Sequence, residues 1–271
     1  MQVKLVYFSG TGNTKFLSEK LLEKFKEKEV RDIQLVPVED ALHDLSSFER
    51  EDVILGIGYP VYDLMPPDII LEFVNKLNKT KSQNLAFVFS TYTTSPLDSN
   101  YYIIEKLQEL GFHVASQEHF KAPGASSYFY FNPNMPVVKG KTVFSKGINE
   151  QLDAFVVDIL NSNNRPNIPI QYNRLNKLHQ SVSKMTMGKL VYRNLKTNSN
   201  CINCGQCAKS CPASNLIMQE GKLVIKNSNG CMRCLRCVQI CSKKAINFTG
   251  LKRKGSYTRE IIESAYSDAV L

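Results

Sequence analysis

The sequence predicts an α/β protein in which a doubly wound, five-stranded parallel sheet is followed by a second, small α+β domain. Five apolar, strand-like segments alternate with helical patterns over the range 1–160. All eight cysteines lie between Cys201 and Cys241. Near position 160 the charge changes sign: residues 1–158 hold 16 lysines and arginines against 21 acidic residues, and residues 159–271 hold 18 against 4, a net charge of +14. These observations indicate two modules.

The first module alternates strands and helices as a parallel sheet requires. Its apolar runs are nearly continuous, which is typical of strands covered on both faces. The predicted strands are 2–9, 32–38, 52–60, 84–91 and 113–120. Between them, helical spacing places on one face Leu17, Leu21 and Phe25, and then Ile103, Leu107 and Leu110. Pro66 and Pro67 suit the first turn of the next helix, and a last helix is expected at 145–160.

Four segments follow from these patterns. Residues 1–160 form the sheet domain, and 161–199 form a basic linker. The linker begins with an Asn- and Pro-rich stretch and continues with a connecting helix in which Leu175, Leu178 and Val182 share a face. Residues 200–250 form the cysteine-rich domain, and 251–271 form a helical tail.

The cysteines form a duplicated motif, in which each cysteine of the first copy has a counterpart at the same position of the second. Cys201, Cys204, Cys207 and Cys211 repeat as Cys231, Cys234, Cys237 and Cys241. A zinc ribbon needs two well-separated C-x2-C pairs, and a third cysteine at this spacing has no use in that geometry. A cuboidal iron–sulfur cluster does use it, because a short loop then binds three corners and a distant thiolate binds the fourth.

These two motifs resemble those of bacterial ferredoxins that carry two 4Fe–4S clusters, over about residues 200–250. The resemblance implies that the fourth cysteine of each motif ligates the other cluster. One cluster then takes Cys201, Cys204, Cys207 and Cys241, and the other takes Cys231, Cys234, Cys237 and Cys211. It also suggests a shared core of Ile202, Leu216, Met232 and Ile246. Ser242 stands where the family usually has proline.

The first strand ends in "SGTGNT", residues 9–14, and leads directly into a helix. Lys15 stands where a dinucleotide-binding fingerprint needs its third glycine, and no Walker-type lysine follows. Three hydroxyls and the free amides of a helix N-terminus suit a single phosphate. A turn that merely caps the helix would need only one of these hydroxyls.

This loop resembles the FMN phosphate loop of the flavodoxin family, over about residues 1–160. The resemblance implies a flavodoxin-like sheet with FMN at the carboxyl ends of its strands, and it places the isoalloxazine ring between the loops after the third and fourth strands. Tyr62 and Tyr92 are the candidates to stack on the ring, and an aromatic loop at 122–134 is a further candidate wall. The predicted FMN-binding residues are Ser9, Gly10, Thr11, Gly12, Asn13, Thr14, Pro60, Val61, Tyr62, Ser90, Thr91 and Tyr92.

Together the two halves resemble the flavodoxin–ferredoxin fusion proteins of anaerobic microbes. The resemblance implies an electron carrier that relays electrons between two 4Fe–4S clusters and FMN and docks to a redox partner protein, with no catalytic residue of its own. The alternative is a flavin-dependent reductase of a small molecule, with the clusters as its electron source. A nucleic-acid binder is disfavoured because the basic residues are not interleaved with stacking aromatic residues.

The distribution of charge and apolar residues adds three expectations. The basic second half favours an acidic partner and docking onto the acidic first half, with Lys243 and Lys244 as candidate contacts. No run of eighteen apolar residues exists, so no membrane span is expected. The expected location is the cytoplasm, where clustered cysteines indicate metal binding instead of disulfides.

Overall fold

The computed structural model describes residues 2–80, 84–132, 135, 138, 140–173, 175–176, 195–227, 230–248 and 252–270. Its first half is built on a five-stranded parallel sheet with the order β2-β1-β3-β4-β5, which is the flavodoxin-like doubly wound order. The strands are β1 (Gln2–Tyr7), β2 (Ile33–Pro37), β3 (Val53–Pro60), β4 (Leu85–Tyr92) and β5 (His113–Lys121). The predicted fold class and all five predicted strands are confirmed.

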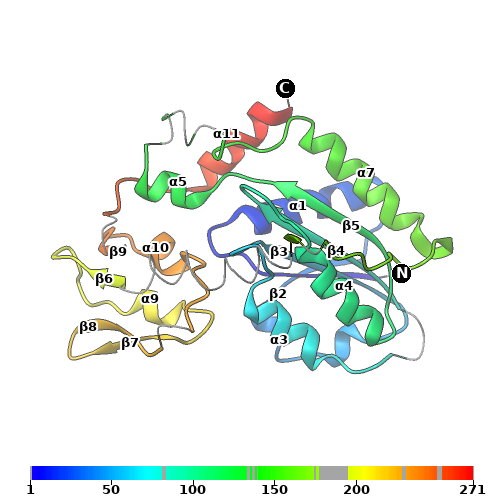
Figure 1. The fold of residues 1–271 in the computed structure, drawn as a ribbon, viewed down its shortest axis with the longest axis horizontal. Coiled ribbons are helices and arrows are strands. Elements are labelled where there is room, and N and C mark those ends of the chain that lie inside the picture. The colour runs from blue at the N-terminus through cyan, green and yellow to red at the C-terminus, as the bar shows by residue number, and fades with distance from the viewer. Residues whose placement is uncertain are drawn as a thin grey trace.

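Helices cover both faces of this sheet (Figure 1). One face is covered by α1 (Asn13–Glu27), α7 (Ile148–Leu160) and α11 (Arg259–Val270), and the other by α3 (Asp68–Lys76) and α4 (Ser99–Glu109). A short helix, α2 (Val38–Ala41), follows β2. The predicted apolar faces are buried, since Leu17, Leu21 and Phe25 lie in the first core and Ile103 and Leu107 in the second. Pro67 caps α3, so that helix begins one residue after the prolines.

The cysteine-rich half contains two small antiparallel pairs and two short helices. Strand β6 (Leu195–Thr197) pairs with β9 (Ile246–Phe248), and β7 (Leu216–Gln219) pairs with β8 (Lys222–Ile225). Helix α9 (Gln206–Lys209) and helix α10 (Arg236–Ile240) begin at equivalent positions of the two motifs. This half lies beside the carboxyl ends of the parallel strands (Figure 1).

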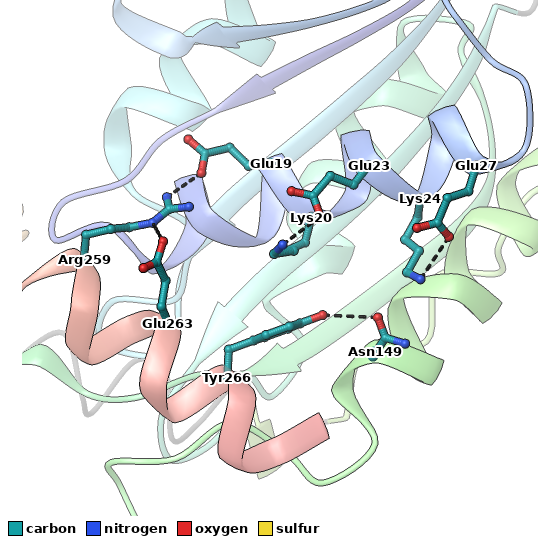
Figure 2. Close-up of polar contacts among 9 residues, drawn as sticks. All are labelled: Glu19, Lys20, Glu23, Lys24, Glu27, Asn149, Arg259, Glu263 and Tyr266. Atoms are coloured by element: carbon teal, nitrogen blue, oxygen red, sulfur yellow. Dashed lines mark hydrogen bonds and ion pairs between the residues drawn. The ribbon is translucent and has the colours of Figure 1, made fainter. Parts of the chain in front are cut away.

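Helix α11, predicted as part of a tail, completes the first core. Ile262, Ala265 and Ala269 are buried against α1 and α7. Arg259 forms ion pairs with Glu19 of α1 and with Glu263 of its own helix, and the hydroxyl of Tyr266 donates to Asn149 of α7 over 3.4 Å (Figure 2). The cysteine-rich half is therefore inserted between two helices of the sheet domain.

The predicted linker also contacts the first half. The amide of Ile168 donates to the carbonyl of Val114 in β5 over 2.8 Å, and Gln108 of α4 donates to the carbonyl of Ile168 over 2.9 Å. Leu175 is 66% exposed. Leu178 and Val182 of the predicted connecting helix lie outside the described residues.

The predicted aromatic loop at 122–134 contains a helix, α5 (Ala125–Tyr130). Phe129 and Tyr130 of this helix are buried in the first core, and Tyr128 packs against Tyr257 with ring centroids 5.0 Å apart. The expectation of a loop is wrong for residues 125–130, which form a helix because their aromatic side chains pack into the core. In the described part of the chain, no helix is both long enough and apolar enough to cross a membrane.

Candidate functional site

The turn between β1 and α1 presents backbone amides at the edge of the sheet. Gly12, which precedes α1, has φ 115°, a left-handed conformation that a residue with a side chain rarely adopts. Its amide donates to the hydroxyl oxygen of Ser9 over 3.2 Å. The first amides of a helix have no partner within the helix, so those of Asn13 and Thr14 are available to an anion.

Thr14 connects this turn to the neighbouring strand. Its hydroxyl shares a 2.8 Å hydrogen bond with that of Thr91 near the end of β4, and both side chains are buried. Whichever hydroxyl donates in this pair, the other keeps its proton for a further acceptor. Two predicted site residues, one in the first turn of α1 and one in β4, are thus brought together.

A cleft of about 210 Å³ opens at this edge of the sheet. Predicted FMN-binding residues on its wall are Ser9, Gly10, Thr11, Asn13, Thr14, Pro60, Val61, Tyr62, Thr91 and Tyr92. Gly12 and Ser90 are not on the wall, and the hydroxyl of Ser90 instead shares a 2.7 Å hydrogen bond with Nδ1 of His119. Asn13 lies on the wall, but its side chain donates to the carbonyl of Pro123 and accepts from Tyr257.

The two candidate ring-stacking tyrosines have different surroundings. Tyr62 packs edge-on against Phe8, with centroids 6.4 Å apart, and burial raises its pKa well above the ordinary value. Tyr92 makes an edge contact with His119 at 6.5 Å and lies on the cleft wall. Tyr62 thus packs on the sheet core and lies within electrostatic reach of Cys234 and Arg236, whereas the ring contact of Tyr92 lies within the sheet domain.

The cysteines gather around two further cavities. One is lined by Cys211, Cys231, Cys234 and Cys237, which we call the proximal set. The other is lined by Cys201, Cys204, Cys207 and Cys241, which we call the distal set. These are the two ligand sets that the crossover predicts.

Four thiols around one cavity suit a cuboidal cluster, in which each thiolate binds a different iron. Among the described residues, no three His, Cys, Asp or Glu side chains are close enough together to hold a single metal ion. A cuboidal cluster holds its thiolates further apart, because each binds a different iron. Backbone amides donate to the crossover sulfurs: Asn215 to Cys211 over 3.4 Å, and Ala245 to Cys241 over 3.3 Å. These amides occupy equivalent positions after the two motifs, so both halves of the duplication place the same donor.

The proposed hydrophobic core of this half is partly wrong. Leu216 and Ile246 are buried as expected, but Ile202 is 61% exposed. Met232 packs against the core of the sheet domain. Burial raises the pKa of the Cys234 thiol to about 11, with smaller contributions from neighbouring groups. A metal bound to this thiol would therefore displace its proton at neutral pH.

The proximal set contacts the sheet domain directly. A side chain at Gly10 would overlap the carbonyl oxygen of Cys234 and the hydroxyl of Tyr62, so only glycine permits this close approach. Arg236 pairs with Glu39, donates to the carbonyl of Ser9 over 2.9 Å and lies 5.0 Å from the ring centre of Phe8.

The cleft wall also includes residues that sequence reasoning missed. From the sheet domain these are Asp63 and Thr93, and from the cysteine-rich half they are Arg233, Cys234 and Leu235. Residues 122–126, part of the segment expected as a further wall, also line the cleft. Arg233 forms an ion pair with Asp63 over 2.5 Å. Among the described residues, the ion pairs between the cysteine-rich segment 200–250 and the sheet domain come from Arg233 and Arg236, whereas Lys243, an expected contact, lies on the wall of the distal cavity. The signal in the sequence was the pair of arginines in the second motif, whose counterparts in the first motif are Asn203 and Gln206.

Residues 193–242 match the family model described as "4Fe-4S dicluster domain". The chain joins a flavodoxin-like sheet to a 4Fe–4S dicluster domain. This domain supports an electron-transfer role and iron–sulfur clusters as cofactors.

Solved structures similar to this chain match over its first half. One is rubredoxin oxygen:oxidoreductase from the anaerobe Desulfovibrio gigas, with 18% identity, a TM-score of 0.42 and coverage of 58% of this chain and 35% of that one. The match thus spans about a third of that oxidoreductase. Others are oxidised flavodoxin 1 from Bacillus cereus (20% identity, TM-score 0.40, coverage 59% and 97%) and a flavodoxin from the domain Archaea (20%, 0.40, 59% and 96%). No curated protein matched the sequence.

Proposed function

We propose that this protein relays electrons between FMN bound in the cleft and two 4Fe–4S clusters held by the proximal and distal cysteine sets. One observation carries the proposal: the loop that bears Cys234 both contributes to the proximal set and forms part of the cleft wall. FMN accepts two electrons and releases them singly, whereas each cluster carries one. The two kinds of cofactor would then lie in direct succession.

The residues of the cleft fit FMN. The amides at the start of α1 and the hydroxyls of Thr11 and Thr14 suit its phosphate. Tyr92 offers an aromatic side chain for the ring, and the apolar wall at Pro60 and Val61 excludes water from it. These residues bind and orient the nucleotide, and the electron chemistry is that of the flavin.

The distal set would exchange electrons with a partner protein. Cys204 is exposed, and the cavity of this set is flanked by Ile202, 61% exposed, and Ile240, 45% exposed. Apolar side chains at the centre of a contact with charge around it are typical of protein interfaces. Because the second half carries a net charge of +14 and Lys243 lines this cavity, the partner is an acidic redox protein.

A flavin-dependent reductase is the second candidate, and one observation favours it. The segment 122–126 forms part of the cleft wall and would border a substrate beside the flavin. Against it, the aromatic side chains of Phe129 and Tyr130 that follow are buried in the core and are not on this wall. The electron carrier is therefore the stronger proposal.

A redox titration tests the relay. Protein prepared without oxygen is titrated stepwise while EPR reports the clusters and visible absorption reports the flavin. We expect one flavin and two 4Fe–4S signals per chain, with magnetic interaction between the reduced proximal cluster and the flavin when the flavin holds one extra electron. Absence of flavin binding, or a single cluster per chain, would refute the proposal.

A further inference from the structure

Arg233 lies between two cluster cysteines and also reaches the nucleotide cleft. The residue lines both the cleft and the proximal cavity. One end of its guanidinium pairs with Asp63 over 2.5 Å. The other end, Nη1, is buried and has no hydrogen-bond partner among the described residues.

An unpartnered guanidinium nitrogen is costly to bury. Removing such a donor from water without an acceptor costs about 1–3 kcal/mol, and more for a charged group. Asp63 is itself partly buried, and this burial raises the pKa of its carboxyl, while Arg233 acts to lower it. The guanidinium of Arg233 is a rigid planar group, so its ion pair with Asp63 fixes the direction in which Nη1 can donate a further hydrogen bond.

The cluster loop itself does not require this arginine. In the duplicated motif its counterpart is Asn203, which has the same left-handed φ of 56° and is exposed. Both loops thus have the same backbone conformation with different side chains. The arginine occurs in the repeat that faces the sheet domain.

We propose that Nη1 of Arg233 donates a hydrogen bond to the phosphate of the FMN, so that the cluster loop completes the nucleotide site. This inference rests on the proposed function above. The phosphate is the favoured acceptor because the neighbouring residues lie on the phosphate turn: Arg236 donates to the carbonyl of Ser9, and Cys234 touches Gly10. Among the residues on the described cleft wall, Arg233 is the cationic one and Asp63 the acidic one.

A consequence of this arrangement is coupling between the two cofactors. Because the loop between Cys231 and Cys234 is shaped by its cluster, loss of that cluster releases Arg233 from the cleft. The coupling is reciprocal, so bound FMN also stabilises the cluster loop. A flavodoxin-like site held by the sheet domain alone would show no such dependence.

Equilibrium binding of FMN and of riboflavin to the full chain tests the proposal. Arg233→Gln is expected to weaken FMN about ten- to hundredfold, the range for a hydrogen bond to a charged group, and to leave riboflavin unchanged. Asp63→Asn removes the competing carboxylate and the repulsion it exerts, and is expected to tighten FMN several-fold. The matched control Lys222→Gln removes one positive charge from an exposed position of the same half and should change neither.

The outcomes separate this inference from the proposed function. Equal losses for FMN and riboflavin, or unchanged FMN affinity in Arg233→Gln, would overturn the phosphate contact. Iron content and visible spectra show whether Arg233→Gln keeps its clusters. If it loses them, Asp63→Asn decides, because it lies outside the cluster loop: tighter FMN binding supports the inference, and unchanged or weaker binding overturns it. Failure of the unmodified protein to bind FMN would instead overturn the proposed function.

Discussion

The hydroxyl of Tyr257 donates to Oδ1 of Asn13 over 2.5 Å. This bond joins the segment that follows the cluster motifs to the first turn of α1, and Asn13 passes the connection on by donating to the carbonyl of Pro123 over 2.6 Å. The segment that precedes α11 thus supports the predicted phosphate turn through the hydrogen bond to Asn13. Its geometry depends on residues almost the whole length of the sequence away.

Shortening Ile262 should loosen this support. Its Cδ1 lies 2.9 Å from where a side chain at Gly12 would begin, and the residue is 2% exposed. We expect Ile262→Ala to lower the free energy of unfolding by about 2–5 kcal/mol through the cavity it leaves. We also expect weaker FMN binding. Denaturant unfolding and flavin titration measure the two effects, with Val270→Ala, 41% exposed, as the control. Unchanged stability would show that α11 does not support the turn.

Exchange of single cysteines for serine should reveal the crossover. Cys211 and Cys231 line the same cavity although they belong to different motifs, whereas Cys201 lines the other. We expect Cys211→Ser and Cys231→Ser to damage the same EPR signal and Cys201→Ser to damage the second. The unmodified protein should carry roughly eight iron atoms and eight sulfides per chain. A Cys211→Ser spectrum matching that of Cys201→Ser would contradict this assignment.

Thr14→Ala should weaken FMN and spare riboflavin. The hydroxyl of Thr14 is buried beside the turn and bonded to Thr91, and one proton of the pair remains for the phosphate. A hydrogen bond to a charged acceptor contributes about 1.5–3 kcal/mol, which sets the expected loss. Fluorescence titration with both ligands provides the comparison. Equal losses would show that this turn does not hold the phosphate.

Charge reversal should separate the internal interface from the external one. Arg236 pairs with Glu39 across the two halves, whereas Lys243 lies beside the distal cavity. We expect Arg236→Glu to slow electron transfer between FMN and the clusters after flash reduction. Lys243→Glu should leave that internal rate unchanged and slow exchange with an acidic partner.

Salt supplies a second test of the same interface. Raising ionic strength from 0.02 to 0.5 M shortens the Debye length from about 20 Å to about 4 Å, but half-buried pairs are screened less than exposed charges. The internal rate should therefore depend on salt more weakly than the exchange with the partner. An internal rate as salt-sensitive as the partner reaction would indicate that the halves separate in solution.

The stability of the sheet should fall in mild acid because of His119. Burial lowers the pKa of this histidine to about 4, and the charge of Asp98 only partly opposes this. The unfolded chain takes up this proton near pH 6.5, whereas the folded chain takes it up only near pH 4. The stability that the protein has with a neutral His119 is therefore complete above pH 6.5 and decreases as the pH falls toward 4. The loss approaches roughly 3 kcal/mol below pH 4. Denaturant unfolding at pH 7.5 and 5.5 should show a larger drop in the unmodified protein than in His119→Gln. Equal drops would exclude His119 as the cause.

Local sequence patterns predicted the sheet well because burial on both faces leaves a clear signal. The apolar runs at 52–60 and 84–91 are β3 and β4, and the strand order follows from the alternation with helices. The hydroxyls of Ser9 and Thr14 also indicated the turn, because few other functions need them together. Both the apolar runs and the hydroxyl-rich turn are patterns of residues that lie close together in the sequence.

Features that depend on contacts between distant segments were missed. The ferredoxin resemblance places Ile202 in the core, but the side chain is exposed, because in a cysteine-rich loop the backbone follows the positions of the cysteines and not an apolar period. Helix α11 has an ordinary amphipathic pattern that does not say which core it joins. Arg233 and Arg236 contributed only to a net charge until the structure placed Asp63 and Glu39 opposite them.

The insertion of the cysteine-rich half between α7 and α11 has a consequence for synthesis of the protein. On the ribosome, β1 to α7 emerge first, but the face of α1 that α11 covers stays exposed until the whole cysteine-rich segment has been translated. The proposed flavin site therefore cannot mature before the cluster loops exist. When the protein is made in iron-depleted cells, we therefore expect a chain that binds little flavin and is sensitive to proteases, and we do not expect an iron-free flavoprotein.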